Sequence, residues 1–105
     1  MKNLLLLFLL VLASNVHATL SVVGEVTILE TWEGITGPLI AMTDMSATDG
    51  QCVKNNLYIL DTNHPFFEEN FSILLSARIS GSSVKLYFDP GVCIGQFLRI
   101  AHIKL

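Results

Sequence analysis

An uninterrupted apolar run near the start of the chain limits what the rest of it can fold into. The run spans residues 4–12, and Lys2 is the only charged residue before it. A short stretch follows that ends in Ala18, with small or branched residues at the last and third-last positions before a cut there. This pattern predicts a signal peptide over residues 1–18. The run is too short to span a bilayer, which takes roughly 20 residues, so no membrane span is expected.

Cleavage after Ala18 would leave residues 19–105, enough for a single small domain with a limited core. The cut removes one of the six basic residues and none of the nine acidic ones, which moves the net charge from −3 to −4. A nucleic-acid partner is not expected, because phosphate binding needs a basic face. We expect an exported bacterial protein, either periplasmic or secreted.

The chain has two cysteines, Cys52 and Cys93. In an oxidising compartment, an even number of cysteines in a small domain is typical of a disulfide. The bond would close a loop of about 42 residues and stabilise the fold by roughly 4 kcal/mol in the chain-entropy model. The alternatives are two free thiols or a bond between two chains.

Hydrophobic patterning predicts three strands in the first half of the domain. Residues 20–32 alternate, with Val22, Gly24, Val26 and Ile28 on one face. Residues 39–43 predict a second strand. Residues 52–60 predict a third, with Val53, Leu57 and Ile59 as core candidates.

The pattern then changes to a helical period. Polar residues followed by Pro65 predict a helix start within residues 61–65, and Ser80-Gly81 predicts its end. Glu68 and Glu69 fall in the first turn, where the helix dipole favours negatively charged side chains. The apolar stripe is Phe67, Phe71, Leu74 and Leu75, widened by Phe66, Ile73 and Ala77.

Two more strands are predicted after the helix. Residues 83–89 alternate, with Val84, Leu86 and Phe88 on one face, and Asp89-Pro90-Gly91 is expected to end this strand. Cys93 is placed in the following loop, and residues 97–105 form the last strand.

The element order is therefore β-β-β-α-β-β, a mainly β fold with one helix. A small five-stranded barrel of the OB type carries its helix between the third and fourth strands. The alternative is an open antiparallel sheet with one packed helix. The barrel is favoured because it removes exposed sheet edges.

The second half of the chain resembles small exported bacterial proteins related to the B subunit of subtilase cytotoxin. The resemblance covers about sixty residues, mostly from Cys52 onward, and Gly24 and Val26 fit it loosely. The residues that carry it are Leu74-Leu75, Ser80-Gly81, Val84, Leu86, Tyr87, Cys93, Ile100, Ile103 and Leu105. It implies an OB-fold module that assembles into a homo-oligomeric ring, often a pentamer, and binds glycans. No sugar-binding residue of that family can be matched to a position in this chain.

Trp32 and Glu33 are the candidate ligand-binding residues. An exposed indole can stack on the apolar face of a sugar while a neighbouring carboxylate accepts its hydroxyl hydrogens. The alternative places Trp32, the only tryptophan, in the core or in a contact between subunits. Phe66, Ile73 and Ala77 form an apolar surplus that one small domain cannot easily cover, which favours a homo-oligomer.

No motif predicts an enzyme, a metal site or a cofactor. The chain lacks Glu-x-x-His and His-x-x-x-His spacings and a Gly-x-Ser-x-Gly nucleophile elbow. Asp61 and His64 are interpreted as residues of the helix start and not as an acid–base pair. The expected function is an exported, non-enzymatic binding module with an extracellular glycan as ligand. The alternative is a structural or inhibitory envelope protein without a ligand.

Overall fold

The computed structural model describes residues 20–105, so the predicted signal peptide lies outside the described residues. This part of the chain contains six strands, one α-helix and a short 3-10 helix. They are β1 (Leu20–Gly24), β2 (Val26–Glu30), β3 (Leu39–Met42), η1 (Ser46–Thr48), β4 (Tyr58–Ile59), α2 (Phe67–Ser80), β5 (Val84–Ile94) and β6 (Phe97–Lys104).

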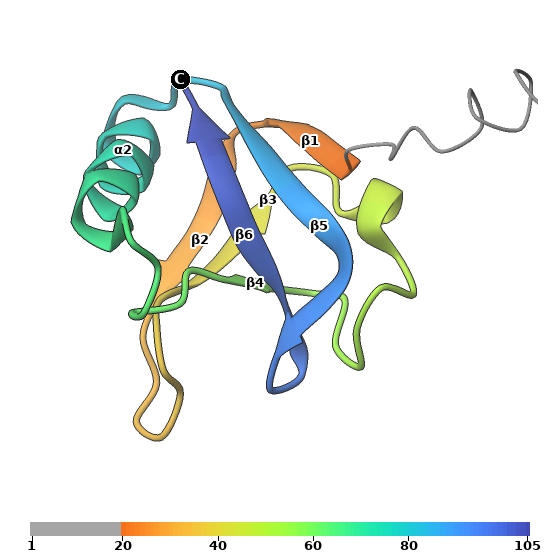
Figure 1. Ribbon diagram of the computed structural model, residues 1–105. Coiled ribbons are helices and arrows are strands. Elements are labelled where there is room, and N and C mark those ends of the chain that lie inside the picture. The colour runs from red at the N-terminus through yellow and green to blue at the C-terminus, as the bar shows by residue number, and fades with distance from the viewer. Residues whose placement is uncertain (1–19) are drawn as a thin grey trace, which may run out of the picture.

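The six strands form one sheet in the order β1-β5-β6-β4-β3-β2 (Figure 1). Neighbouring strands are antiparallel, except that β4 and β6 run parallel. The prediction of a mainly β fold with one helix is confirmed. The pairings fit an open sheet with one packed helix. The sheet has six strands where the sequence predicts five, because the first predicted strand is divided in two.

The division falls at Glu25, the single residue between β1 and β2. β1 pairs with β5 and β2 pairs with β3, so the chain changes its hydrogen-bond partner here. Glu25 N–H donates to Thr43 Oγ1 over 2.9 Å, and Thr43 N–H donates to the Glu25 carbonyl over 3.1 Å. Thr43 thus satisfies both backbone groups of Glu25. A Cβ on Gly24 would lie 2.8 Å from Thr43 Oγ1, which explains the glycine.

The alternation predicted for the first strand fails in β2. A bulge lies between Val26 and Ile28, and only Val26 is buried, whereas Ile28 is 42% exposed. A bulge inserts an extra residue, so the inward positions resume one residue later. Leu29 therefore packs against the core in place of Ile28.

The prediction of a third strand over residues 52–60 is wrong except at β4. Residues 43–57 form a long connection that includes η1, and Val53, a predicted core residue, is 79% exposed. Asn55 and Asn56 disfavour a strand. Lys54 N–H donates instead to the Gln96 carbonyl, in the turn between β5 and β6, over 2.9 Å.

β5 is longer than predicted and continues through Asp89-Pro90-Gly91 to Ile94. Its pairing with β6 is irregular there: Phe88 opposes Ile100, and the next pair is Cys93 with Leu98. The interruption is absorbed within the strand, so Cys93 lies in β5 and the prediction that it lies in a loop is wrong.

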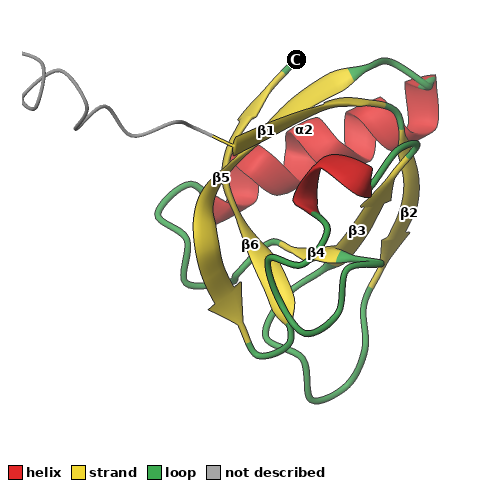
Figure 2. Ribbon diagram, turned by 90° about the vertical axis from the view of Figure 1, so that its right-hand side faces the viewer, coloured by secondary structure: helices red, strands yellow, loops and turns green. Residues whose placement is uncertain are grey.

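The predicted helix is present as α2, but it begins at Phe67 and not within residues 61–65, which belong to a turn before it. It ends at Gly81, which has a positive φ of 72° and donates its N–H to the Ala77 carbonyl. Its buried residues are Asn70, Leu74 and Ala77, so the stripe is rotated from the predicted one and Leu75 is 42% exposed. The helix contacts β2 and β6, which are not hydrogen-bond neighbours (Figure 2).

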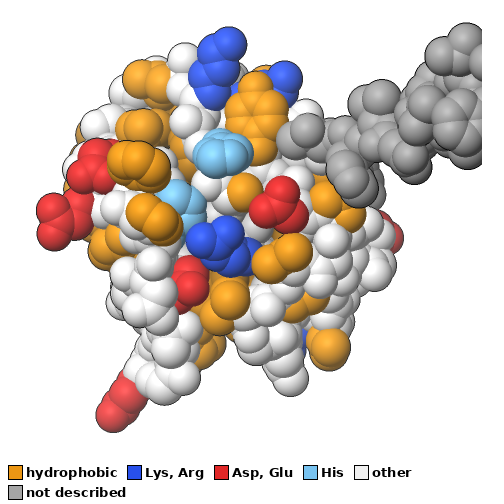
Figure 3. Space-filling view, viewed as in Figure 1, with side chains coloured by type: hydrophobic (Ala, Val, Ile, Leu, Met, Phe, Trp, Pro, Cys, Tyr) orange, Lys and Arg blue, Asp and Glu red, His pale blue; other side chains and the backbone are white. Residues whose placement is uncertain are grey.

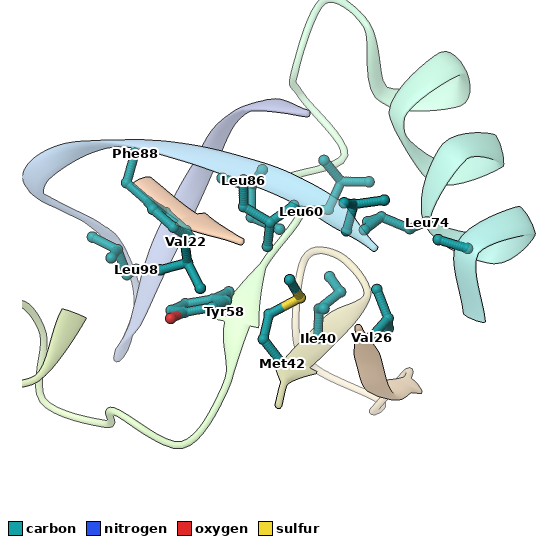
Figure 4. Packing of buried hydrophobic residues seen from close by; sticks show 13 residues of the cluster. Val22, Val26, Ile40, Met42, Tyr58, Leu60, Leu74, Leu86, Phe88 and Leu98 are labelled. Atoms are coloured by element: carbon teal, nitrogen blue, oxygen red, sulfur yellow. The ribbon is translucent and has the colours of Figure 1, made fainter. Parts of the chain in front are cut away.

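The main core lies inside the curved sheet, and a smaller cluster lies on its outer face. Figure 4 shows the main core, where side chains from the strands meet Leu74 of α2. Tyr58 and Phe88 are its largest side chains, with ring centroids 4.5 Å apart. The smaller cluster consists of Leu39, Ile59 and Phe97, whose positions alternate with core residues of β3, β4 and β6.

The predicted disulfide between Cys52 and Cys93 is present. It joins the long connection after β3 to the end of β5, across a sequence separation of 41 residues. Gln51 adds to this tie, because its Oε1 accepts the Gly91 N–H over 2.8 Å. The bond therefore holds a segment that has little regular structure of its own.

Loss of the disulfide should lower the free energy of unfolding by about 2–5 kcal/mol, because the unfolded chain regains the freedom of a long loop. Cys52→Ser, Cys93→Ser and the double variant should have the same urea midpoint, since each removes one and the same bond. Urea denaturation followed by circular dichroism measures this midpoint. A single variant that unfolds at the wild-type urea concentration would contradict the role given to the bond.

A buried hydroxyl pair fixes η1 to the core. Thr48 Oγ1 and Tyr58 Oη lie 2.7 Å apart, and the Thr48 hydroxyl also lies within hydrogen-bond distance of the Met45 carbonyl. Burial raises the pKa of Tyr58; the hydrogen bond with Thr48 opposes this effect and the charge of Asp44 adds to it. The neutral phenol is therefore the form that the fold favours.

The raised pKa of Tyr58 predicts a loss of stability in alkali. Below the pKa of about 10 of an unfolded tyrosine its contribution is fully present, and it is lost as the pH rises towards the folded pKa. Urea midpoints measured at increasing alkaline pH should fall, and they should fall less steeply for Tyr58→Phe. Equal slopes for the two proteins would show that Tyr58 does not contribute.

Candidate functional site

The two sequence-predicted ligand residues, Trp32 and Glu33, line a hollow of about 460 Å³ on the outer face of the sheet. Trp32 is 61% exposed, so it does not belong to the core. The floor of the hollow is apolar and includes Leu39, Leu57 and Phe97. These side chains belong to or pack on the smaller hydrophobic cluster, which therefore supports the hollow from below.

Polar and charged side chains complete the wall of the hollow. Glu30 stands at the end of β2, and Lys54 and Asn56 come from the long connection before β4. The hollow thus combines two carboxylates, one ammonium group and one amide around an indole. A second hollow of about 480 Å³ shares Lys54, Ile35 and Phe97 with the first, so the two are neighbours.

The loop that carries Trp32 is tied down at its base. Leu60 N–H donates to the Pro38 carbonyl, and Thr62 donates to the Thr36 carbonyl through both its N–H and its hydroxyl, over 2.9–3.0 Å. Gly37 packs so closely against the Leu60 carbonyl that no Cβ would fit there. The loop between β2 and β3 is therefore anchored to the segment that follows β4.

The wall of the hollow that carries Lys54 and Asn56 is held in place by the disulfide and by one backbone hydrogen bond. Cys52 is bonded to Cys93, and two residues later Lys54 N–H donates to the Gln96 carbonyl. Sequence reasoning missed Lys54 and Asn56 as site residues. The expected disulfide was the available signal, because it places the residues after Cys52 beside the turn that follows Cys93.

Both ring nitrogens of His64 form hydrogen bonds to backbone groups. His64 is buried, its Nε2 lies 2.7 Å from the Ala101 carbonyl, and its Nδ1 accepts the Phe66 N–H over 3.0 Å. The imidazole therefore carries its proton on Nε2 and donates it to Ala101. Asp61 accepts the Asn63 N–H and the His64 N–H through its side chain and carbonyl respectively. Both residues shape the turn before α2.

Within residues 20–105, no three His, Cys, Asp or Glu side chains are grouped so that they could hold a metal ion. No helix in that range is long and apolar enough to cross a membrane. Comparisons of the chain with protein-family models, curated proteins and solved structures found no match.

Proposed function

We propose that this protein is an exported, non-enzymatic binding module that holds a carbohydrate in the hollow beside Trp32. The observation that carries the proposal is an indole that is 61% exposed at the rim of a hollow with an apolar floor. Leaving so large an apolar side chain in water has a cost that a bound ligand would remove.

A sugar matches the chemistry of this hollow. Its C–H face is apolar and can stack on Trp32, while its hydroxyls can donate to Glu30 and Glu33 and accept from Lys54 and Asn56. A few polar groups around an apolar surface are typical of small-molecule sites. The anchored walls support binding further, because a preorganised site loses less conformational entropy when the ligand binds.

The fold part of the proposal is a five-stranded barrel of the OB type. β1 and β2 adjoin at Glu25 and stand at the two ends of the strand order, so together they can act as one bent strand that closes the sheet. OB folds bind oligosaccharides with surface loops and neighbouring strands. The resemblance to the B subunit of subtilase cytotoxin agrees with this fold and supplies no ligand residue.

The homo-oligomeric ring is part of the same proposal. Of the three residues expected to form an apolar surplus, Ala77 is buried, Ile73 is half-buried and Phe66 is 61% exposed. Leu75 and Ile79 of α2 are also exposed, Ile79 by 78%. Burying such side chains between identical subunits is a common solution for small proteins.

Ligand binding should change the fluorescence of Trp32, which is the only tryptophan and so reports on the hollow alone. Oligosaccharides that give signals on a glycan array are the probes for titration. Glu33→Gln and Lys54→Gln should each weaken binding about tenfold or more, because they remove charge-assisted hydrogen bonds.

Glu68→Gln is the matched control, since Glu68 is an exposed carboxylate on α2 outside the hollow. It should bind as the wild type does. An array without any saturable signal would favour the structural envelope protein over the binding module.

The domain that begins at Thr19 should run as a homo-oligomer in size-exclusion chromatography with light scattering. Ile79→Ser should shift it towards the monomer, because Ile79 is among the most exposed apolar side chains. Ser76→Ala, on an exposed position of the same helix, is the control. A monomeric wild type at micromolar concentration would remove the ring.

A further inference from the structure

A second surface, which shares no lining residue with the hollow beside Trp32, combines positive charge with exposed apolar side chains. Strand register places Lys85 opposite Val23 on one side and Lys104 on the other. In the next outward row, Tyr87 lies opposite Ser21 and His102. We call this surface the Lys85–Lys104 face; its residues are Ser21, Val23, Lys85, Tyr87, His102, Lys104 and the adjoining Leu105.

Two lysines on this face occupy paired positions of neighbouring strands. Lys85 and Lys104 are directly opposed, an arrangement that costs free energy through repulsion between like charges. Lys85 Nζ lies 5.0 Å from the centre of the Tyr87 ring, and the Tyr87 and His102 rings are 6.5 Å apart. An anion placed between the two lysines would remove their repulsion.

The apolar members of the face are unusually exposed. Val23 is 63% and Leu105 is 71% exposed, and together with both lysines they line a hollow of about 240 Å³. Figure 3 shows blue side chains beside pale-blue and orange ones at the upper end of the face made by β5 and β6. The acidic residues at the next alternate positions are Glu25 after Val23 and Asp89 after Tyr87.

We propose that the Lys85–Lys104 face docks on an anionic lipid surface. Lysines attract acidic headgroups, exposed Val and Leu side chains enter the boundary of the acyl chains, and tyrosine favours the interface between them. A soluble polyanion would satisfy the two lysines and leave Val23 and Leu105 in water. The exposed apolar pair therefore favours a lipid surface over an acidic protein.

This face could not be predicted from the sequence, because its two lysines are far apart along the chain. Lys85 and Lys104 belong to different strands and become neighbours only through the pairing of β5 with β6. The chain contains no run of basic residues that would predict binding to acidic lipids. The net charge of the whole chain is also negative, so attraction depends on the local surface.

Co-sedimentation with vesicles tests the proposal on the domain from Thr19 onward, which lacks the apolar leader. The protein should bind vesicles of phosphatidylglycerol and phosphatidylcholine in equal amounts and should not bind phosphatidylcholine alone. Lys85→Gln and Lys104→Gln should each lower the partition coefficient about fivefold. Arg78→Gln removes the same charge from an exposed position on α2 and is the matched control.

Val23→Ser separates a lipid surface from a soluble polyanion. It should weaken vesicle binding if the side chain enters the membrane. Unchanged binding by Val23→Ser would reassign the face to an acidic polymer. Absence of vesicle binding, or equal losses for Arg78→Gln and the lysine variants, would overturn the proposal. None of these outcomes depends on a ligand at Trp32.

Discussion

The change of partner at Glu25 is the constraint on which the rest of this fold depends. A continuous stretch of eleven residues runs from Leu20 to Glu30. Its first half, β1, pairs with β5, and its second half, β2, pairs with β3. Such a change leaves the backbone groups at the joint without a ladder partner, and Thr43 supplies both of the missing hydrogen bonds. Gly24 allows the close approach that these bonds require.

The consequences of this joint extend to the candidate site. Because β2 pairs with β3, the loop between them starts and ends beside the hollow and carries Trp32 and Glu33 to its lining. The opposite wall has no strand to hold it and relies on the Cys52–Cys93 bond and on the turn between β5 and β6. One wall is thus positioned by strand pairing and the other by a covalent tie.

Local signals were sufficient for the parts of the fold that local energetics determine. The end of α2 at Gly81, the inward positions of Val84, Leu86 and Phe88, and the disulfide could all be predicted from residue type and spacing. The partner change at Glu25 could not, because the residue that stabilises it, Thr43, lies eighteen positions away. The bulge in β2 and the irregular middle of β5 likewise depend on partner strands. Of the residues that line the candidate site, Trp32 and Glu33 were predicted from the sequence. Lys54 was not, because its place in the site depends on the contact of the long connection with the turn between β5 and β6.

The most direct test of the partner change is nuclear Overhauser contacts between strands, measured by NMR on the isotopically labelled domain. One sample should give contacts of Val22 with Leu86 and of Leu29 with Ile40, because β1 pairs with β5 whereas β2 pairs with β3. If either set were missing, or if residues of β2 made contacts that continue the β1–β5 pairing, the change of partner at Glu25 and the fold built on it would be contradicted.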